Sequence, residues 1–135
     1  MTVTYLDTSA LLALHLDVPA RTTVVAALAD GAPACTLALA LTEALALVDK
    51  LTDDRLLRAD IEDELRLQWD RYHVVPLDQR CLDRATALMR EQPLRLADAL
   101  HLAAADRLPR PVRFVTLDPS QIPVALSLGF DVASP

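Results

Sequence analysis

The chain has 135 residues, of which 53% are hydrophobic, and a formal net charge of -6. This length suits a single domain over residues 1–135, with enough apolar side chains to bury a core. The negative charge excludes a nonspecific nucleic-acid coat protein, which normally carries a basic face, but it does not exclude a nuclease whose carboxylates hold a cation.

The cysteines and the apolar segments exclude three further classes of protein. Cys35 and Cys81 lie in no Cys-x-x-Cys or Cys/His cluster, so neither a disulfide framework nor a zinc site is expected. The longest apolar run, residues 34–48, contains Glu43 and is shorter than the roughly 20 residues that span a bilayer. With no basic leader segment at the start, we expect a soluble, cytoplasmic protein without a membrane segment.

Apolar periodicity predicts strands that alternate with helices along the chain. In chain order, we expect strand 3–6, helices 10–15 and 19–29, strand 34–36, helices 39–50 and 53–72, strand 73–77, helices 79–90 and 94–105, strand 112–117, helix 119–128 and edge strand 131–133. This alternation is typical of right-handed crossovers between parallel strands. The predicted fold class is therefore α/β, a three-layer α/β/α sandwich with a mostly parallel central sheet.

Asp7 ends the first apolar strand and precedes Thr8 and Ser9. In open α/β sheets, ligands bind outside the carboxyl ends of the strands, which is where Asp7 is expected. Two interpretations stay open, a part in the chemistry and a helix cap. Thr8 or Ser9 can also accept hydrogen bonds from the free N–H groups of the following helix.

Glu43 is the only charged residue between Gly31 and Val48. It is expected on an apolar helix just beyond the end of a strand, near Asp7. One interpretation is a functional carboxylate; the other is a side chain that reaches the surface and pairs with an arginine.

Asp98 lies near the start of a helix that is apolar nearly all round and therefore predicted to be buried. A buried carboxylate needs a partner, and a cation would provide one. The alternative is that Asp98 is simply favoured by the dipole of the helix N-terminus. His101 shares its face of the helix, and we expect His101 to be structural.

Two more aspartates end predicted strands and precede helices. Asp118 repeats the pattern of Asp7, although it could also be a cap. Asp78 is expected to be a cap, because the helix after it is an ordinary amphipathic one.

Four carboxylates share the property that each ends or interrupts an apolar segment at the same predicted edge of the sheet. They are Asp7, Glu43, Asp98 and Asp118. Carboxylates crowded together raise one another's pKa, so such a set is sensible mainly if it holds hard divalent cations, of which Mg²⁺ or Mn²⁺ are the natural candidates. We assign Asp7 and Asp98 as direct metal ligands, with Glu43 and Asp118 orienting metal-bound water or helping a second ion. The site would hydrolyse a phosphodiester through metal-activated water.

Hydroxyl side chains near these carboxylates are expected to support them by hydrogen bonds. They are Thr8, Ser9 and Thr116.

Four segments carry these residues: YLDTS at 5–9, TE at 42–43, LRLADALHLA at 94–103 and FVTLD at 114–118. In this order, and over almost the whole chain, they resemble the PIN-domain ribonucleases, particularly the VapC-type toxins of bacterial toxin-antitoxin pairs. The resemblance implies a Mg²⁺- or Mn²⁺-dependent endoribonuclease in which Asp7, Glu43, Asp98 and Asp118 match the acidic quartet of the family.

The resemblance also implies partners. These are an RNA substrate, a second copy in a homodimer, and a cognate VapB-type antitoxin that occupies a groove and inserts a basic side chain among the carboxylates. One departure from the pattern is that Pro119 and Ser120 follow Asp118, where a basic residue would be common. The contact with RNA at that edge is therefore unassigned.

Three other classes of protein fit these residues less well. A catalytically silent PIN-like module acting in protein association would not need four carboxylates in apolar surroundings. A phosphoacceptor receiver domain needs a lysine near its last strand, and the only lysine is Lys50 on a predicted helix. Nucleotide folds with a glycine loop are disfavoured, because Gly31 and Gly129 belong to no phosphate-binding motif.

Overall fold

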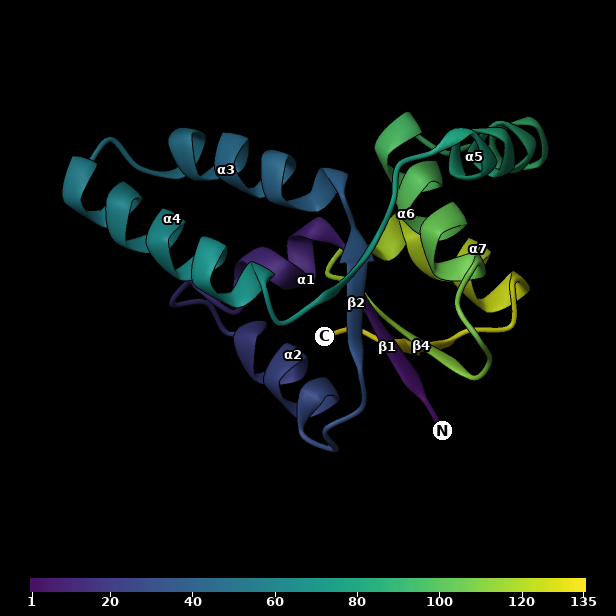
Figure 1. The fold of residues 1–135 in the computed structure, drawn as a ribbon, viewed down its shortest axis with the longest axis horizontal. Coiled ribbons are helices and arrows are strands. Elements are labelled where there is room, and N and C mark those ends of the chain that lie inside the picture. Colours follow the sequence, from purple (N-terminus) through teal and green to yellow (C-terminus); the bar gives the residue numbers. More distant parts are fainter.

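The computed structural model describes all 135 residues and contains a five-stranded sheet between two layers of helices (Figure 1). The strands are β1 (Val3–Leu6), β2 (Ala34–Leu37), β3 (His73–Val75), β4 (Val112–Val115) and β5 (Asp131–Ala133). Their order across the sheet is β3-β2-β1-β4-β5, and every neighbouring pair is parallel. The predicted three-layer α/β fold is confirmed, and the sheet is parallel throughout.

The helices connect these strands as crossovers. They are α1 (Thr8–Ala13), α2 (Arg21–Leu28), α3 (Leu39–Leu51), α4 (Arg55–Trp69), α5 (Gln79–Glu91), α6 (Leu96–Asp106) and α7 (Ile122–Ser127), with a 3₁₀ turn η1 (Pro119–Gln121) before the last. None of them combines the length and the apolar character needed to cross a membrane.

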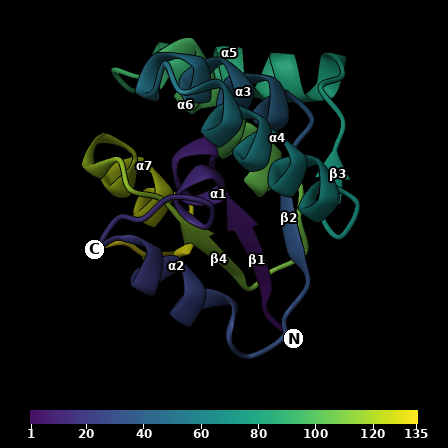
Figure 2. The same cartoon turned by 90° about the vertical axis from the view of Figure 1, so that its left-hand side faces the viewer.

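The sheet buries a separate apolar cluster on each face, because side chains along a strand alternate between faces. Tyr5 and Phe114 pack on the side of α5, α6 and α7, whereas Leu6 and Val115 pack on the side of α1, α2, α3 and α4. The two helical layers lie on the left and the right of the sheet in Figure 1, and Figure 2 views the molecule from the side of the α1–α4 layer. The two central strands, β1 and β4, are thereby buried from both sides.

Two predictions about helix ends were wrong. The first helix begins at Thr8 and not at residue 10. Of the caps considered for it, Asp7 is confirmed in place of Thr8 or Ser9, because the extended backbone of Asp7 lets its carboxylate accept from the Ala10 N–H. The predicted helix 119–128 is divided into η1 and α7, where Pro123 lies in the first turn and has no N–H to continue the earlier hydrogen bonds.

Candidate functional site

The carboxyl ends of the central strands bring acidic side chains to one edge of the sheet. Asp7 directly follows β1, and Asp118 follows the adjacent β4 by three residues. Asp98 lies in the first turn of α6, which packs on the same sheet. This edge is the usual place for a ligand site in a parallel α/β sheet.

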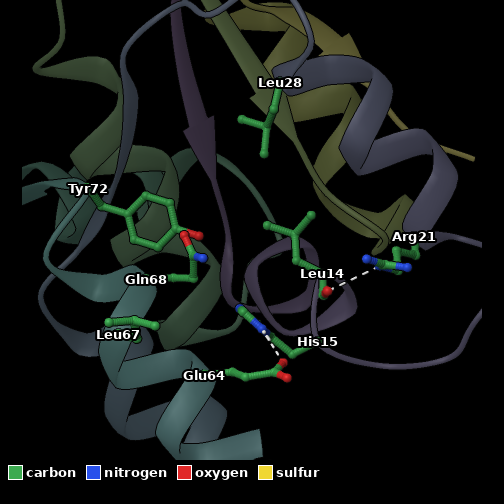
Figure 3. A pocket seen from close by; sticks show the side chains of 8 residues that line it. All are labelled: Leu14, His15, Arg21, Leu28, Glu64, Leu67, Gln68 and Tyr72. Carbon is green, nitrogen blue, oxygen red and sulfur yellow. Dashed lines mark hydrogen bonds and ion pairs between the residues drawn. The ribbon is translucent and has the colours of Figure 1, made fainter.

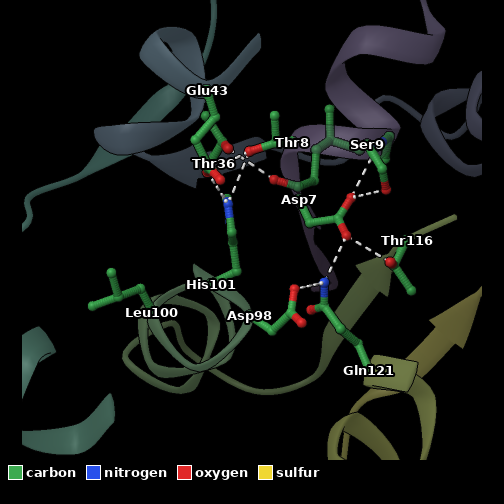
Figure 4. A network of polar contacts seen from close by, with 12 residues as sticks. Asp7, Thr8, Ser9, Thr36, Glu43, Asp98, Leu100, His101, Thr116 and Gln121 are labelled. Carbon is green, nitrogen blue, oxygen red and sulfur yellow. Dashed lines mark hydrogen bonds and ion pairs between the residues drawn. The ribbon is translucent and has the colours of Figure 1, made fainter. Parts of the chain in front are cut away.

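Asp7 is almost completely buried, with 2% of its surface exposed, and accepts four hydrogen bonds (Figure 4). Ser9 Oγ at 2.6 Å and Ala10 N at 2.9 Å donate to Oδ1. Thr116 Oγ1 at 2.5 Å and Gln121 Nε2 at 3.0 Å donate to Oδ2. A carboxylate offers about four lone-pair positions, so all of them are used. Asp7 is thus both a helix cap and a member of the acidic cluster, and a cation at Oδ2 must displace one of two donors.

Gln121 joins two of the predicted metal ligands. Its side-chain Nε2 donates to Asp7 Oδ2 and, at 3.1 Å, to Asp98 Oδ1. Its Oε1 is buried without a hydrogen-bond partner in the protein, which costs free energy. The amide therefore occupies the space between Asp7 and Asp98 where a shared cation would bind. Gln121 is not predicted from the sequence, since glutamine is mostly exposed and this one stands alone before an apolar helix.

Within the acidic cluster, Asp98 is the carboxyl group whose pKa is clearly shifted. Burial raises the pKa of its carboxyl above the usual value, and the negative charges of Asp118 and Asp7 raise it further against the opposing effect of Arg95. Ionised Asp98 is therefore disfavoured in the metal-free protein. Added positive charge at this point would relieve the repulsion.

Arg95 supplies part of that positive charge from the rim of the site. Its Nε lies 3.6 Å from Asp98 Oδ2, and its Nη2 lies 3.7 Å from Asp118 Oδ2. The side chain is 82% exposed, so both contacts are open to solvent and weak. Asp118 also accepts from the Ser120 N–H, so the cap interpretation holds for it as well.

Glu43 lies in an adjoining polar network. Its Oε1 accepts from Thr8 Oγ1 at 2.7 Å and contacts His101 Nε2 at 2.8 Å. Burial alone would raise the pKa of the Glu43 carboxyl, but the hydrogen bonds from His101 and Thr8 outweigh it and hold the pKa below its usual value. Glu43 therefore pairs with a histidine and not with an arginine.

His101 is buried, with 2% of its surface exposed, and connects Glu43 to the core. Its Nδ1 lies 2.7 Å from the Tyr5 hydroxyl on β1. Burial and then the charge of Asp7 raise the pKa of Tyr5 well above its usual value, so the phenol stays protonated. His101 is thus buried between the core and the site, and its hydrogen-bond partner Glu43 is one of the four predicted site residues.

The predicted site residues thus form two connected groups. Asp7, Asp98 and Asp118 form one acidic cluster, and Glu43 stands beside it, held by Thr8, the neighbour of Asp7.

No three histidine, cysteine, aspartate or glutamate side chains converge closely enough to surround one metal ion. The two carboxylates on either side of the Gln121 amide fit a Mg²⁺ or Mn²⁺ ion that keeps several waters. The unpaired Gln121 oxygen and the like charges around Asp98 support this fit.

Asp78 lies outside this site. As predicted, it caps a helix, accepting from the Cys81 N–H at 3.0 Å, and it also pairs with Arg107.

A pocket of about 490 Å³ lies on the other side of α1, between α1, α2 and α4 (Figure 3). Its lining is half apolar and consists of Leu14, His15, Arg21, Leu28, Glu64, Leu67, Gln68 and Tyr72. His15 Nδ1 contacts Glu64 at 3.2 Å, and its buried Nε2 has no partner in the protein. The pocket therefore offers apolar contacts together with a few polar groups at its wall.

Comparison with solved structures gives the same architecture at low sequence identity. VapBC2 from Rickettsia felis bound to a promoter DNA fragment matches with TM-score 0.71 and 14% identity, covering 100% of this chain and 99% of that one. FitAcB from Neisseria gonorrhoeae matches with TM-score 0.70 and 17% identity over 97% and 96%. A toxin-antitoxin complex from Klebsiella pneumoniae matches with TM-score 0.67 and 21% identity over 88% and 89%.

Comparison with curated protein sequences gave no significant match. The family model for the PIN domain, in contrast, matches residues 4–121, a span that includes Asp7, Glu43, Asp98 and Asp118. This chain therefore belongs to the PIN domain family.

Proposed function

We propose that this chain is a metal-dependent endoribonuclease and the toxin component of a VapBC-type toxin-antitoxin pair. The observation that carries the proposal is the position of Asp98, whose carboxylate lies among the charges of Asp118 and Asp7 and shares an amide with Asp7. Such crowding is unfavourable without a cation and useful with one. Membership of the PIN domain family and the likeness to structures of toxin-antitoxin complexes support the same function.

Each acidic residue has a separate task in this proposal. Asp7 and Asp98 bind Mg²⁺ or Mn²⁺ through carboxylate oxygens, which are ligands that these hard ions prefer. Such an ion would supply a water of lowered pKa and would stabilise charge on the phosphodiester. Glu43 would orient a water at this edge and accept its proton through Oε2, the oxygen to which neither Thr8 nor His101 is bonded. Asp118 holds Arg95 at the rim.

The direct test is cleavage of a total cellular RNA pool by purified protein, with Mg²⁺ or Mn²⁺ and with a chelator. We expect metal-dependent cuts by the wild type and by Asp60→Asn, a control at an exposed position on α4. We expect no cuts by Asp98→Asn. If the folded wild type cuts nothing, or cuts equally well with chelator, a PIN-like module acting in protein association becomes the better description.

Arg95 is the proposed contact for the RNA phosphate, in place of the basic residue that Pro119 and Ser120 lack. Arg95→Ala is expected to raise KM for RNA about tenfold, because a hydrogen bond to a charged group contributes about 1.5–3 kcal/mol. It should also make the slope of the logarithm of the RNA-binding constant against the logarithm of the salt concentration less steep by about one, as expected when one phosphate contact is lost. Arg80→Ala, at an exposed position on α5, is the matched control. An unchanged salt dependence would assign the phosphate contact elsewhere.

We further propose that an apolar segment of the antitoxin occupies the pocket between α1, α2 and α4. Leu67 lines this pocket although 66% of its surface is exposed, as expected for a residue that a partner covers. Leu67→Glu should weaken antitoxin binding about 10- to 100-fold, since burying a leucine is worth about 1.5–3 kcal/mol, and should leave RNA cleavage unchanged.

Titration calorimetry with the cognate antitoxin measures this effect. Leu56→Glu provides the control, because Leu56 is an exposed leucine of the same helix that does not line the pocket. Equal weakening by both variants would contradict the placement of the antitoxin in the pocket. The homodimer implied by the sequence resemblance remains a prediction, which light scattering would measure.

A further inference from the structure

We infer that Tyr5 and His101 form a hydrogen-bonded chain that fixes one imidazole tautomer and so positions Glu43 for the reaction. The inference rests on the proposed nuclease function and adds two positioning residues to it. The chain runs from the Tyr5 hydroxyl to His101 Nδ1 at 2.7 Å. It continues from His101 Nε2 to Glu43 Oε1 at 2.8 Å (Figure 4).

The direction of each hydrogen bond follows from the donors and acceptors available. An ionised carboxylate only accepts, so the hydrogen between His101 and Glu43 belongs to Nε2. A neutral imidazole with its hydrogen on Nε2 has an acceptor at Nδ1, which the Tyr5 hydroxyl satisfies by donating. Every group in this buried chain is then paired, whereas the opposite tautomer would place two acceptors, Nε2 and the Glu43 carboxylate, face to face.

Packing leaves the imidazole no alternative position. The rings of Tyr5 and His101 meet edge to face with centroids 5.9 Å apart. Tyr5 is itself stacked on Phe114 of the neighbouring strand, with centroids 5.4 Å apart. Both Tyr5 and His101 are buried, so the packing between β1 and α6 restricts where Nε2 can lie.

The chain controls only one of the two oxygens of Glu43. Thr8 Oγ1 and His101 Nε2 both bond to Oε1, and Thr8 Oγ1 also lies 2.9 Å from Nε2. The Glu43 side chain is 26% exposed, and neither donor bonds to Oε2. Oε1 is therefore an anchor, and Oε2 is left to act on water.

His101 also links the two groups of acidic residues through one helix. It lies on α6 three residues after Asp98, so the same rigid element carries a proposed metal ligand and the partner of Glu43. Since Glu43 is on α3, the hydrogen bond from His101 fixes its distance from the metal-binding group. Without this bond the Glu43 side chain regains several rotamers. The chemical step should then be slower, because the carboxylate spends less time in the reactive position.

The first test reads the tautomer by NMR of protein with ¹⁵N-labelled histidine. We expect His101 to carry its hydrogen on Nε2 in the metal-free wild type at neutral pH. Tyr5→Phe, which removes one hydroxyl and keeps the ring, should leave Nδ1 unpaired. The ¹⁵N chemical shifts of the His101 ring should then change, or should report a mixture of tautomers. A wild-type His101 with its hydrogen on Nδ1, or a signal unchanged in Tyr5→Phe, would overturn the inference.

The second test separates positioning from binding. Tyr5→Phe should lower kcat for RNA cleavage about tenfold, which corresponds to the weakening of one hydrogen bond, and should leave KM and the affinity for Mn²⁺ unchanged. His73→Gln, at an exposed histidine on β3, should change none of these quantities. An unchanged kcat in Tyr5→Phe would show that the chain is only structural. The tautomer test needs no catalysis, so a wild type that shows the expected tautomer but cleaves no RNA would refute the nuclease function and leave the hydrogen-bonded chain intact.

Discussion

Asp98→Asn is expected to abolish metal-dependent RNA cleavage and at the same time to stabilise the metal-free protein. Loss of a metal ligand removes several kcal/mol of transition-state stabilisation, so the rate should fall on the order of 10²–10³-fold. The stabilisation arises because burial, Asp118 and Asp7 disfavour the ionised carboxyl of Asp98, whose pKa is raised. A neutral amide at this position removes that repulsion and can still accept from Gln121.

Chemical unfolding of the metal-free wild type and variant measures the stability difference at pH 7. Asp60→Asn again serves as the control, since it removes a carboxylate at an exposed position away from the cluster. Added Mn²⁺ should stabilise the wild type and have much less effect on Asp98→Asn. A variant that is less stable than the wild type without metal would show that the charges around Asp98 are already compensated.

The pH dependence of this difference has a definite sign. Because the pKa of Asp98 is raised in the fold, the folded protein holds this proton more tightly than the unfolded chain. The contribution of Asp98 to the free energy of unfolding should therefore fall as the pH rises from the ordinary aspartate pKa through the raised one, so the stability advantage of Asp98→Asn over the wild type should grow across this range. Glu43, whose pKa is lowered, contributes stability that is lost as the pH falls, but it is present in both proteins and cancels in the difference.

Asp7→Asn is expected to abolish cleavage to a similar extent but to destabilise the protein. All four acceptor positions of Asp7 are filled by donors, two of them on each oxygen. An asparagine replaces one oxygen with an NH₂ group, which would face two donors inside the protein. Leaving a buried donor unpaired costs about 1–3 kcal/mol. The two metal ligands thus differ in structural role although they share one function.

Comparison of the two variants by thermal unfolding and RNA cleavage tests this difference. Asp7→Asn should have a lower Tm than the wild type, and metal-free Asp98→Asn a higher one. Assays at a temperature where both variants are folded keep the loss of cleavage separate from the loss of structure. Equal Tm values for the two variants would mean that the hydrogen bonds of Asp7 contribute little to stability.

The sequence predicted the fold because each local pattern agrees with the global arrangement. Apolar runs ending in Asp7 and Asp118 marked β1 and β4, and parallel strands must present their carboxyl ends at one edge. The position of Asp98 followed from a helix too apolar to lie on the surface. For Asp7 and Asp118 a cap and a place in the acidic cluster are not alternatives, because both residues cap helices within the cluster.

The contacts of the site could not be predicted in the same way. Gln121 bonds to Asp7 over 114 positions of sequence, and the bond between His101 and Glu43 spans 58, so neither pair has a local signal. Arg95 was visible within the segment of residues 94–103, but only the structure places it against Asp118 as well as Asp98. Such pairings depend on how the layers meet, which periodicity does not specify.

The most direct test of the proposed function measures Mn²⁺ binding by calorimetry and RNA cleavage in the same preparation of wild-type protein over a range of Mn²⁺ concentrations. We predict that the cleavage rate rises in proportion to metal occupancy, and that Asp98→Asn loses both binding and cleavage. Cleavage that persists without bound metal, or that survives in Asp98→Asn, would contradict a metal-dependent mechanism centred on Asp7 and Asp98.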